Sequence, residues 1–156
     1  MTYSKQITQK LSDLDRKILE ILLKNSRISS RQIAKKTKNS VATIINHIKR
    51  LEDNGIIKKY TAVLDYDKIG YDVGIIVQVR ISKGNLKEVF NQFASYPNVI
   101  SVYDVIGNFD AIVIARFKSR KQVRDFIHKI QNFEFVERTE TILVLDSVKE
   151  QVYELL

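Results

Sequence analysis

Cysteine is absent from this chain of 156 residues, and proline occurs only once. Without thiols the protein can form no disulfide, no thiol nucleophile and no cysteine-ligated zinc or iron–sulfur site. Long apolar runs and lipidation motifs are also missing, which argues against a membrane partner. The first residues, MTYSKQITQKLSDLDRK, lack the apolar segment of a signal peptide. We therefore predict an intracellular, cytoplasmic protein.

Signatures of catalysis are missing as well. The chain has two histidines, His47 and His128. Neither is accompanied by a carboxylate pair, a serine elbow, a phosphate-binding loop or a His/Glu metal spacing. We therefore predict no catalytic residue, no metal site and no cofactor, and a protein that is not an enzyme.

Positive charge is concentrated in one part of the sequence. Residues 1–60 carry 14 Lys or Arg against 5 Asp or Glu, whereas residues 61–156 carry 12 against 13. Contact with nucleic-acid phosphates requires such a local excess of cations. We expect residues 1–60 to bind double-stranded DNA.

The segment 28–55 has the pattern of two short helices around a tight turn. Ser29 and Gln32 match a capping box, which starts the first helix. Ser40 can cap the second helix by accepting a hydrogen bond from its first turn, and Gly55 can end it in the left-handed conformation. This pattern predicts a helix-turn-helix that reads DNA.

The second of these helices has two different faces. Val41, Ile44, Ile48 and Leu51 recur at three- and four-residue spacing, which gathers them on one apolar face. The other side carries polar and small side chains that suit a major groove, although an ordinary surface helix has a polar face too. The residues that we predict to contact DNA are Arg31, Ser40, Ala42, Thr43, Asn46, His47, Lys49 and Arg50.

A further helix precedes this pair. Ser12 and Asp15 signal its start, and Ile18 and Leu22 lie on its apolar face. Three helices can then share one core, which predicts a winged helix-turn-helix domain over residues 1–60. Helical spacing is lost after Gly55, so we expect a strand or an extended hinge and place the linker at 61–71.

The remaining residues, 72–156, predict a second domain. Alternating and helical apolar spacings follow one another in the order βαββαβ. The expected strands are 73–81, 99–106, 111–117 and 135–145, and the expected helices contain 86–94 and 123–130. This order is that of the ferredoxin-like fold, a sheet with two helices on one face, so the fold class is α+β.

One face of this sheet needs a cover that the chain does not supply. In strand 111–117 both alternating sets of side chains are apolar, which indicates burial on both sides. They are Ala111, Val113 and Ala115 on one side and Ile112 and Ile114 on the other. Because a partner subunit is the simplest cover, we expect at least a homodimer.

From about Leu11 to Lys149 the sequence resembles the Lrp/AsnC family of amino-acid-responsive transcription regulators, and most of all its small archaeal members. The resemblance rests on motifs that are individually modest and jointly specific. They are LDRKIL from Leu14, Ser40 at the start of the reading helix, Leu51-Glu52, Gly55-Ile56-Ile57 and the turn Gly107-Asn108-Phe109-Asp110. The resemblance implies a DNA-binding domain joined to a ligand-sensing βαββαβ (RAM) domain that builds dimers and often octamers.

The resemblance also implies an amino-acid effector held between subunits near this turn. The residues that it implicates are Tyr103, Gly107, Asn108, Phe109, Asp110, Arg138, Thr139 and Thr141. Their chemistry agrees, because backbone N–H groups at the glycine can bind a carboxylate and Asp110 can hold an ammonium. Without the family, the same residues fit an ordinary hairpin turn and strand-favouring threonines.

Two departures from the family pattern affect these expectations. Family members often have Gly-Asp-Tyr-Asp in the turn, where this chain has Asn108 and Phe109, and two adjacent arginines where it has Asn46 and His47. Because Asn108 offers a neutral amide in place of a carboxylate, we predict glutamine as the effector.

The two-domain plan also resembles siroheme decarboxylases, which are enzymes on a related scaffold. The charge of residues 1–60 has no role in decarboxylating a tetrapyrrole, so this is the alternative and the regulator is the main hypothesis. The sequence leaves open the operator, the target genes, the sign of regulation, the identity of the effector and the exact oligomeric state.

Overall fold

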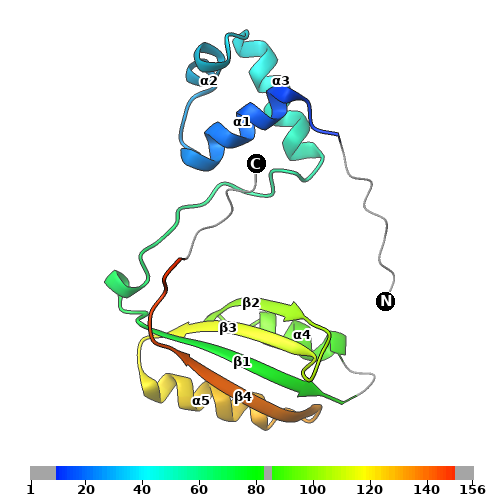
Figure 1. Cartoon of the computed structure of the whole chain (residues 1–156), viewed down its shortest axis with the longest axis vertical. Helices are drawn as coiled ribbons and strands as arrows, with labels where there is room; N and C mark the ends of the chain where they lie inside the picture. The colour runs from blue at the N-terminus through cyan, green and yellow to red at the C-terminus, as the bar shows by residue number, and fades with distance from the viewer. Residues whose placement is uncertain (1–9, 83–85, 150–156) are drawn as a thin grey trace. The chain divides into compact units, whose positions relative to one another are not determined.

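The chain folds into two compact units, which we describe from a computed structural model of residues 10–82 and 86–149. The units divide between Val63 and Leu64, inside the predicted linker (Figure 1). Parts of both predicted domains, residues 1–9, 83–85 and 150–156, lie outside the described residues. The first unit below is residues 10–63, and the second unit is residues 64–149.

Three helices make up the first unit, as predicted. They are α1 (Asp13–Lys24), α2 (Ser30–Thr37) and α3 (Val41–Asp53). Ser12 and Ser29 form the two expected capping boxes, and the hydroxyl of Ser40 accepts a hydrogen bond from the backbone N–H of Thr43. Gly55 follows α3 with a φ of 67°, the left-handed conformation that ends many helices. Local signals therefore define the starts of all three helices and the end of α3.

Apolar side chains from all three helices close one small core. Its buried members are Ile18, Leu19, Leu22, Ile33, Ala34, Ile44 and Leu51. Ile48 packs against this core, but Val41 is 39% exposed. Val41, the first residue of α3, is thus not part of the buried core, although its spacing from Ile44 gathers both on one side of the helix.

After α3 the chain is extended, as expected for a hinge. Tyr60 Oη donates a hydrogen bond of 2.7 Å to Glu52 Oε1, which ties this segment to α3. Between Gly55 and Val73 the regular structure is limited to the 3-10 turn η1 (Asp67–Ile69), which opens the second unit.

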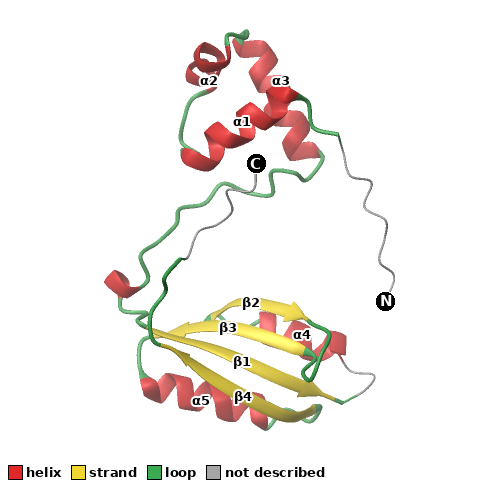
Figure 2. Cartoon of the chain, in the orientation of Figure 1, coloured by secondary structure: helices red, strands yellow, loops and turns green. Residues whose placement is uncertain are grey.

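The second unit is a four-stranded antiparallel sheet with two helices on one face (Figure 2). The elements are β1 (Val73–Ile81), α4 (Leu86–Ala94), β2 (Val99–Asp104), β3 (Ala111–Phe117), α5 (Arg120–Gln131) and β4 (Val136–Val144). The spatial order β2-β3-β1-β4 confirms the ferredoxin-like prediction. Strand β2 ends two residues earlier than expected, because Val105 N donates to the carbonyl of Asp110 and closes the turn.

The two faces of the sheet differ in cover. Side chains such as Val77 and Val113 lie fully buried beneath α4 and α5, together with Phe93 and Ile130. The register pairs Ile76 with Ile114, and these side chains belong to the opposite, open face. They are half-buried, which confirms that β3 is apolar on both sides.

Candidate functional site

The outer face of α3 is the first candidate site. Ala42, Asn46, Lys49 and Arg50 are exposed there, and Thr43 and His47 are half-buried. Arg31 on α2 and Ser40 at the start of α3 are exposed as well. All eight side chains predicted to contact DNA thus reach the surface of the first unit to some extent.

Two apolar residues also lie on this surface. Ile45 is 49% exposed and Val41 is 39% exposed. Exposed methyl groups on a reading helix can contact the methyl group of thymine in the major groove. The prediction omitted both residues, although the position of Ile45 about 100° from Ile44 on the helix could have indicated its exposure.

A buried carboxylate connects α1 to the reading helix. Asp15 is 3% exposed and accepts hydrogen bonds from Ser12 N at 2.9 Å and Ser12 Oγ at 2.7 Å. It also lies 2.7 Å from His47 Nδ1, and Arg50 Nη2 donates to both of its oxygens at 2.8 Å. Asp15 was expected only to start α1; in the structure it also holds two side chains of α3.

The pKa of Asp15 reflects this crowded environment. Burial raises the pKa of the carboxyl, but the hydrogen bonds from Ser12, His47 and Arg50 outweigh burial and place the pKa well below its usual range. Asp15 is therefore ionised under all ordinary conditions. The carboxylate of Asp15 forms an ion pair with the guanidinium of Arg50. In contrast, no carboxylate lies within ion-pair distance of Lys49 in the described part of the chain.

The turn 105–110 in the second unit is the other candidate site. Asp110 N donates to Val79 O, and Ile81 N donates to Asp110 Oδ2 at 2.9 Å. Arg80 Nη1 donates to the carbonyl oxygens of Gly107 and Asn108, and Arg80 Nε lies 3.5 Å from Asp110 Oδ2. Asp110 therefore fixes the turn to the end of β1, in addition to any role toward a ligand.

Arg80 is a member of this site that the sequence did not reveal. Its position in an apolar, alternating strand indicates a side chain on the open face, but gives no partner. Arg138 lies near the same turn, with its guanidinium 5.8 Å from the centre of the Phe109 ring. Arg80 thus contacts the half-buried carboxylate of Asp110, and Arg138 contacts the neighbouring Phe109 ring.

The remaining effector candidates are spread over the sheet. Thr139 and Thr141 pair with Val79 and Val77, whose side chains lie on the helix-covered face, whereas Arg138 pairs with Arg80 on the open face. Thr139 Oγ1 accepts a hydrogen bond from Gln131 of α5. Tyr103 lies on β2, at the opposite edge of the sheet from β4. One chain therefore brings together only part of the predicted set.

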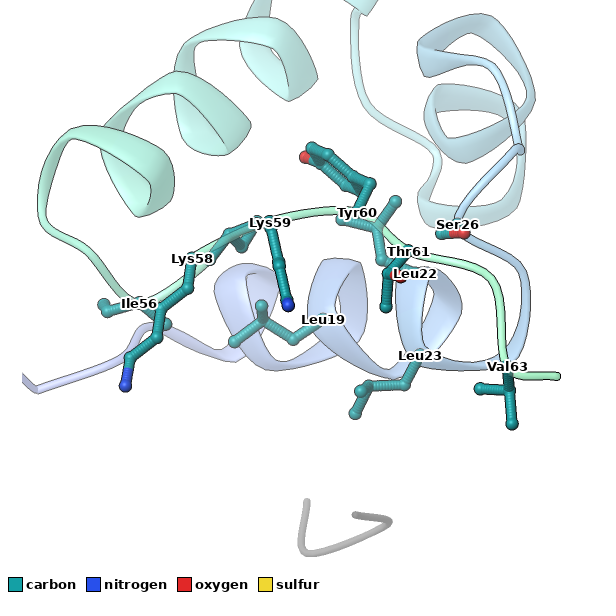
Figure 3. Close-up of a pocket in the computed structure, with 11 residues that line it drawn as sticks. Leu19, Leu22, Leu23, Ser26, Ile56, Lys58, Lys59, Tyr60, Thr61 and Val63 are labelled. Carbon is teal, nitrogen blue, oxygen red and sulfur yellow. The ribbon is translucent and has the colours of Figure 1, made fainter. Parts of the chain in front are cut away.

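A shallow groove of about 260 Å³ lies in the first unit. Leu19, Leu22 and Leu23 from α1 form one side, and the segment 56–63 runs along the other (Figure 3). All of its lining residues belong to the first unit, whereas every predicted effector residue belongs to the second. The groove is therefore distinct from the turn 105–110.

Comparison with known proteins identifies both units. A family described as "Lrp/AsnC ligand binding domain" matches residues 74–153, and "Winged helix-turn-helix DNA-binding" matches residues 11–58. An uncharacterised HTH-type transcriptional regulator of Pyrococcus horikoshii is 45% identical over 90% of this chain and 95% of its own length. The chain belongs to the Lrp/AsnC family. The regulator LrpC of Bacillus subtilis is 32% identical over 77% of this chain and 83% of its own length.

Solved structures of the Lrp/AsnC family confirm the fold. AsnC of Escherichia coli superposes with a TM-score of 0.86 at 25% identity, covering 93% of this chain and 99% of that one. The protein is thus a DNA-binding transcription regulator of the Lrp/AsnC type with a ligand-binding domain. Its relatives in Pyrococcus confirm the resemblance to archaeal members.

Two further observations concern membranes and metals. Within residues 10–82 and 86–149 no helix is long and apolar enough to cross a membrane. The same residues contain no group of three or more His, Asp or Glu side chains that could hold a metal ion.

Proposed function

We propose that this Lrp/AsnC regulator reads double-stranded DNA with the outer face of α3 and that a free amino acid bound by the second unit alters its DNA binding. The observation that carries the proposal is the exposed polar face of α3 on the part of the chain that holds the excess positive charge. An effector can change DNA binding only if it favours one assembly, or one spacing of reading heads, over another.

Sequence reading by α3 is testable by binding-site selection. Asn46 and Thr43 lie on the predicted reading face, and an amide or hydroxyl can contact base edges in the major groove. Thr43 also belongs to the cap of α3, so Asn46→Ala is the cleaner change. Selection of DNA sites from a random duplex library should give a different preferred sequence for Asn46→Ala than for the wild type. An unchanged preference would remove Asn46 from the reading face.

The proposed effector is glutamine. Asn108 and Gly107 are exposed in the turn, and their carbonyl groups are held by Arg80, which leaves the Asn108 amide available. Calorimetric titration of the full chain against the twenty amino acids should rank glutamine first. A preference for an acidic amino acid would contradict the role assigned to Asn108, and no binding by any amino acid would contradict the sensor itself.

We further propose a homodimer that assembles to a higher oligomer, with an octamer as the expected state. The support is the half-buried apolar strip of Ile76, Ile112 and Ile114 on the open face of the sheet. Thr139 and Thr141 would then reach the effector from a neighbouring subunit. Mixed oligomers of Asp110→Asn and Thr141→Val chains should recover a fraction of intact sites if each single variant is inactive and the subunits exchange. Recovery of none would place the whole site within one chain.

The proposed function includes no catalysis. Homologues are named transcriptional regulators. The absorbance spectrum of the purified protein tests the alternative, because a bound tetrapyrrole would give a strong visible band. Its presence would favour a decarboxylase-like enzyme over the regulator.

A further inference from the structure

His47 occupies an unusual position on the reading helix. Its side chain is 21% exposed, and its Nδ1 lies 2.7 Å from the buried carboxylate of Asp15 on α1. Because a carboxylate only accepts hydrogen bonds, Nδ1 must carry the proton in this contact. The imidazole is therefore held in one orientation by a residue of another helix.

The other ring nitrogen of His47 faces water. No partner of Nε2 is found among the described residues, and the same residues contain no buried side-chain nitrogen or oxygen that lacks a hydrogen-bond partner. Since a buried Nε2 would be such an atom, Nε2 must be accessible from outside. Asp15 thus fixes the inner nitrogen and leaves the outer nitrogen available on a helix that reads DNA.

Two charged groups contact the ring. The carboxylate of Asp15 on α1 lies 2.7 Å from Nδ1, and Nη2 of Arg50 on α3 lies 3.3 Å from the same nitrogen. Arg50 and His47 are both donors to the carboxylate of Asp15, so the three groups form one cluster with two cationic members when His47 is protonated. From α2, no charged group lies within ion-pair distance of His47 in the described chain.

We propose that Asp15 is a positioning residue that presents His47 to DNA as a pH-dependent donor. Protonated His47 donates Nε2–H to an acceptor on the DNA, either a phosphate oxygen or an acceptor on a guanine edge. Neutral His47 keeps its proton on Nδ1 and has no proton on Nε2 to donate. DNA affinity therefore falls as the pH rises. This inference rests on the proposed DNA-reading function of α3.

The sequence contains few other side chains that could cause a pH dependence in this range. Imidazole is the side chain whose ordinary titration falls between about pH 5 and 8. The sequence has two histidines and no cysteine, so His128 is the other side chain of this kind. It is exposed on α5 in the second unit, outside the predicted DNA contacts. His128→Gln is therefore the matched control.

The test is the DNA affinity of the full-length protein as a function of pH at constant salt. A duplex of mixed sequence, long enough for two reading heads and labelled with a dye whose emission does not change with pH, serves as the probe in an anisotropy titration. Measured from about pH 5.5 to 8, wild type and His128→Gln should both bind more weakly as the pH is raised, by up to about tenfold per pH unit for each imidazole that is protonated on binding. His47→Arg should keep the affinity of the acidic form over the whole range, and His47→Gln should keep that of the neutral form.

Asp15→Asn separates positioning from mere stabilisation of the fold. The amide carries no charge and no longer offers two carboxylate oxygens to hold the ring, so the pH-dependent loss of affinity should shrink even at a temperature where the variant is fully folded. A guanine-rich and a guanine-free duplex distinguish the two acceptors, because a phosphate contact gives the same pH dependence with both.

Two results would overturn the inference while leaving the proposed function intact. One is strong, salt-dependent DNA binding by the wild type that does not change with pH. The other is a pH dependence that survives unchanged in His47→Arg and in His47→Gln. Failure of every variant to bind DNA at any pH would instead reject the DNA-reading function itself.

Discussion

The two units of the chain expose surfaces of different chemistry. The first unit closes its core with three helices and leaves a positively charged exterior, since residues 1–60 hold 14 basic against 5 acidic residues. The second unit has nearly balanced charge and leaves one apolar face of its sheet open. This difference is expected if the first unit binds an anion and the second unit packs against an apolar surface.

The units are alike in one respect: each places a carboxylate between two elements of its site. Asp15 joins α1 to α3 and is nearly fully buried, whereas Asp110 joins the turn 105–110 to β1 and is half-buried. Arg50 donates to both oxygens of Asp15, whereas Ile81 N and Arg80 Nε both contact Oδ2 of Asp110. Asp110 is therefore the carboxylate with capacity left for a ligand.

The largest effect is expected from a charge on the open face. Ile114→Asp would bury an unpaired carboxylate in the proposed subunit interface, which should weaken dimerisation by at least about a hundredfold. Ile45→Asp, on the exposed surface of α3, is the matched change in the first unit. Sedimentation equilibrium should show dissociation for Ile114→Asp alone. A monomeric wild type, or an intact oligomer of Ile114→Asp, would show that this face is not the interface.

The buried carboxylate of the first unit should make that unit acid-sensitive. Because the pKa of Asp15 is lowered in the folded state, its contribution is complete above the ordinary carboxyl range and is lost as the pH falls below it. We expect about 1 to 3 kcal/mol of unfolding free energy to depend on it. The protection factors of the α1 and α3 amides, which are exchange rates corrected for their intrinsic pH dependence, should fall on acidification, and less so in Asp15→Asn. An equal fall in both proteins would argue against this role.

Replacing Asp110 should affect effector binding more than folding, provided the acceptor to Ile81 N is kept. Asp110→Asn retains a side-chain oxygen for that N–H but removes the charge for an ammonium group. We expect a loss of about 1.5 to 3 kcal/mol in effector affinity, as for a hydrogen bond to a charged group. Calorimetry measures it, with sedimentation as the control for assembly. Full binding by Asp110→Asn would assign Asp110 a purely structural role.

The smallest effect is expected from Lys49. Its ammonium is exposed on α3, whereas the guanidinium of Arg50 is shared with Asp15, so Lys49→Ala is the cleaner test of phosphate contact than a double variant. The slope of log affinity against log salt should fall by about one unit. Lys24→Ala, at the far end of α1, is the control and should leave the slope unchanged. The same slope for both variants would mean that Lys49 does not face the backbone of DNA.

Much of this architecture could be predicted from the sequence, because its signals are local. Helices begin at capping residues such as Ser12, Ser29 and Ser40. Strands begin where the apolar spacing changes from helical to alternating. The βαββαβ order then determines the sheet. Contacts between segments that are distant in the sequence could not be predicted from such local signals. Asp15 reaches His47 and Arg50 across more than thirty residues, and Arg80 reaches the turn at Gly107 across 27.

The spatial arrangement of the predicted effector residues could not be predicted from the sequence either. The resemblance to the family placed Arg138, Thr139 and Thr141 together on one strand, but the period of two in a strand sends their side chains to different faces. A site completed by a second subunit cannot be assembled from one chain's sequence. Within the described residues, the single chain brings Arg80 to Asp110 and Arg138 to Phe109 at the turn.

The most direct test of the account is the salt dependence of DNA binding by the full-length protein. If the positive first unit binds phosphates, affinity for a duplex should fall steeply with salt, with a slope of about −0.9 for each phosphate contacted. Several contacts per reading head would then cost orders of magnitude between low and physiological salt. An affinity that hardly changes with salt, or no binding even at low salt, would contradict the assignment of DNA binding to the first unit.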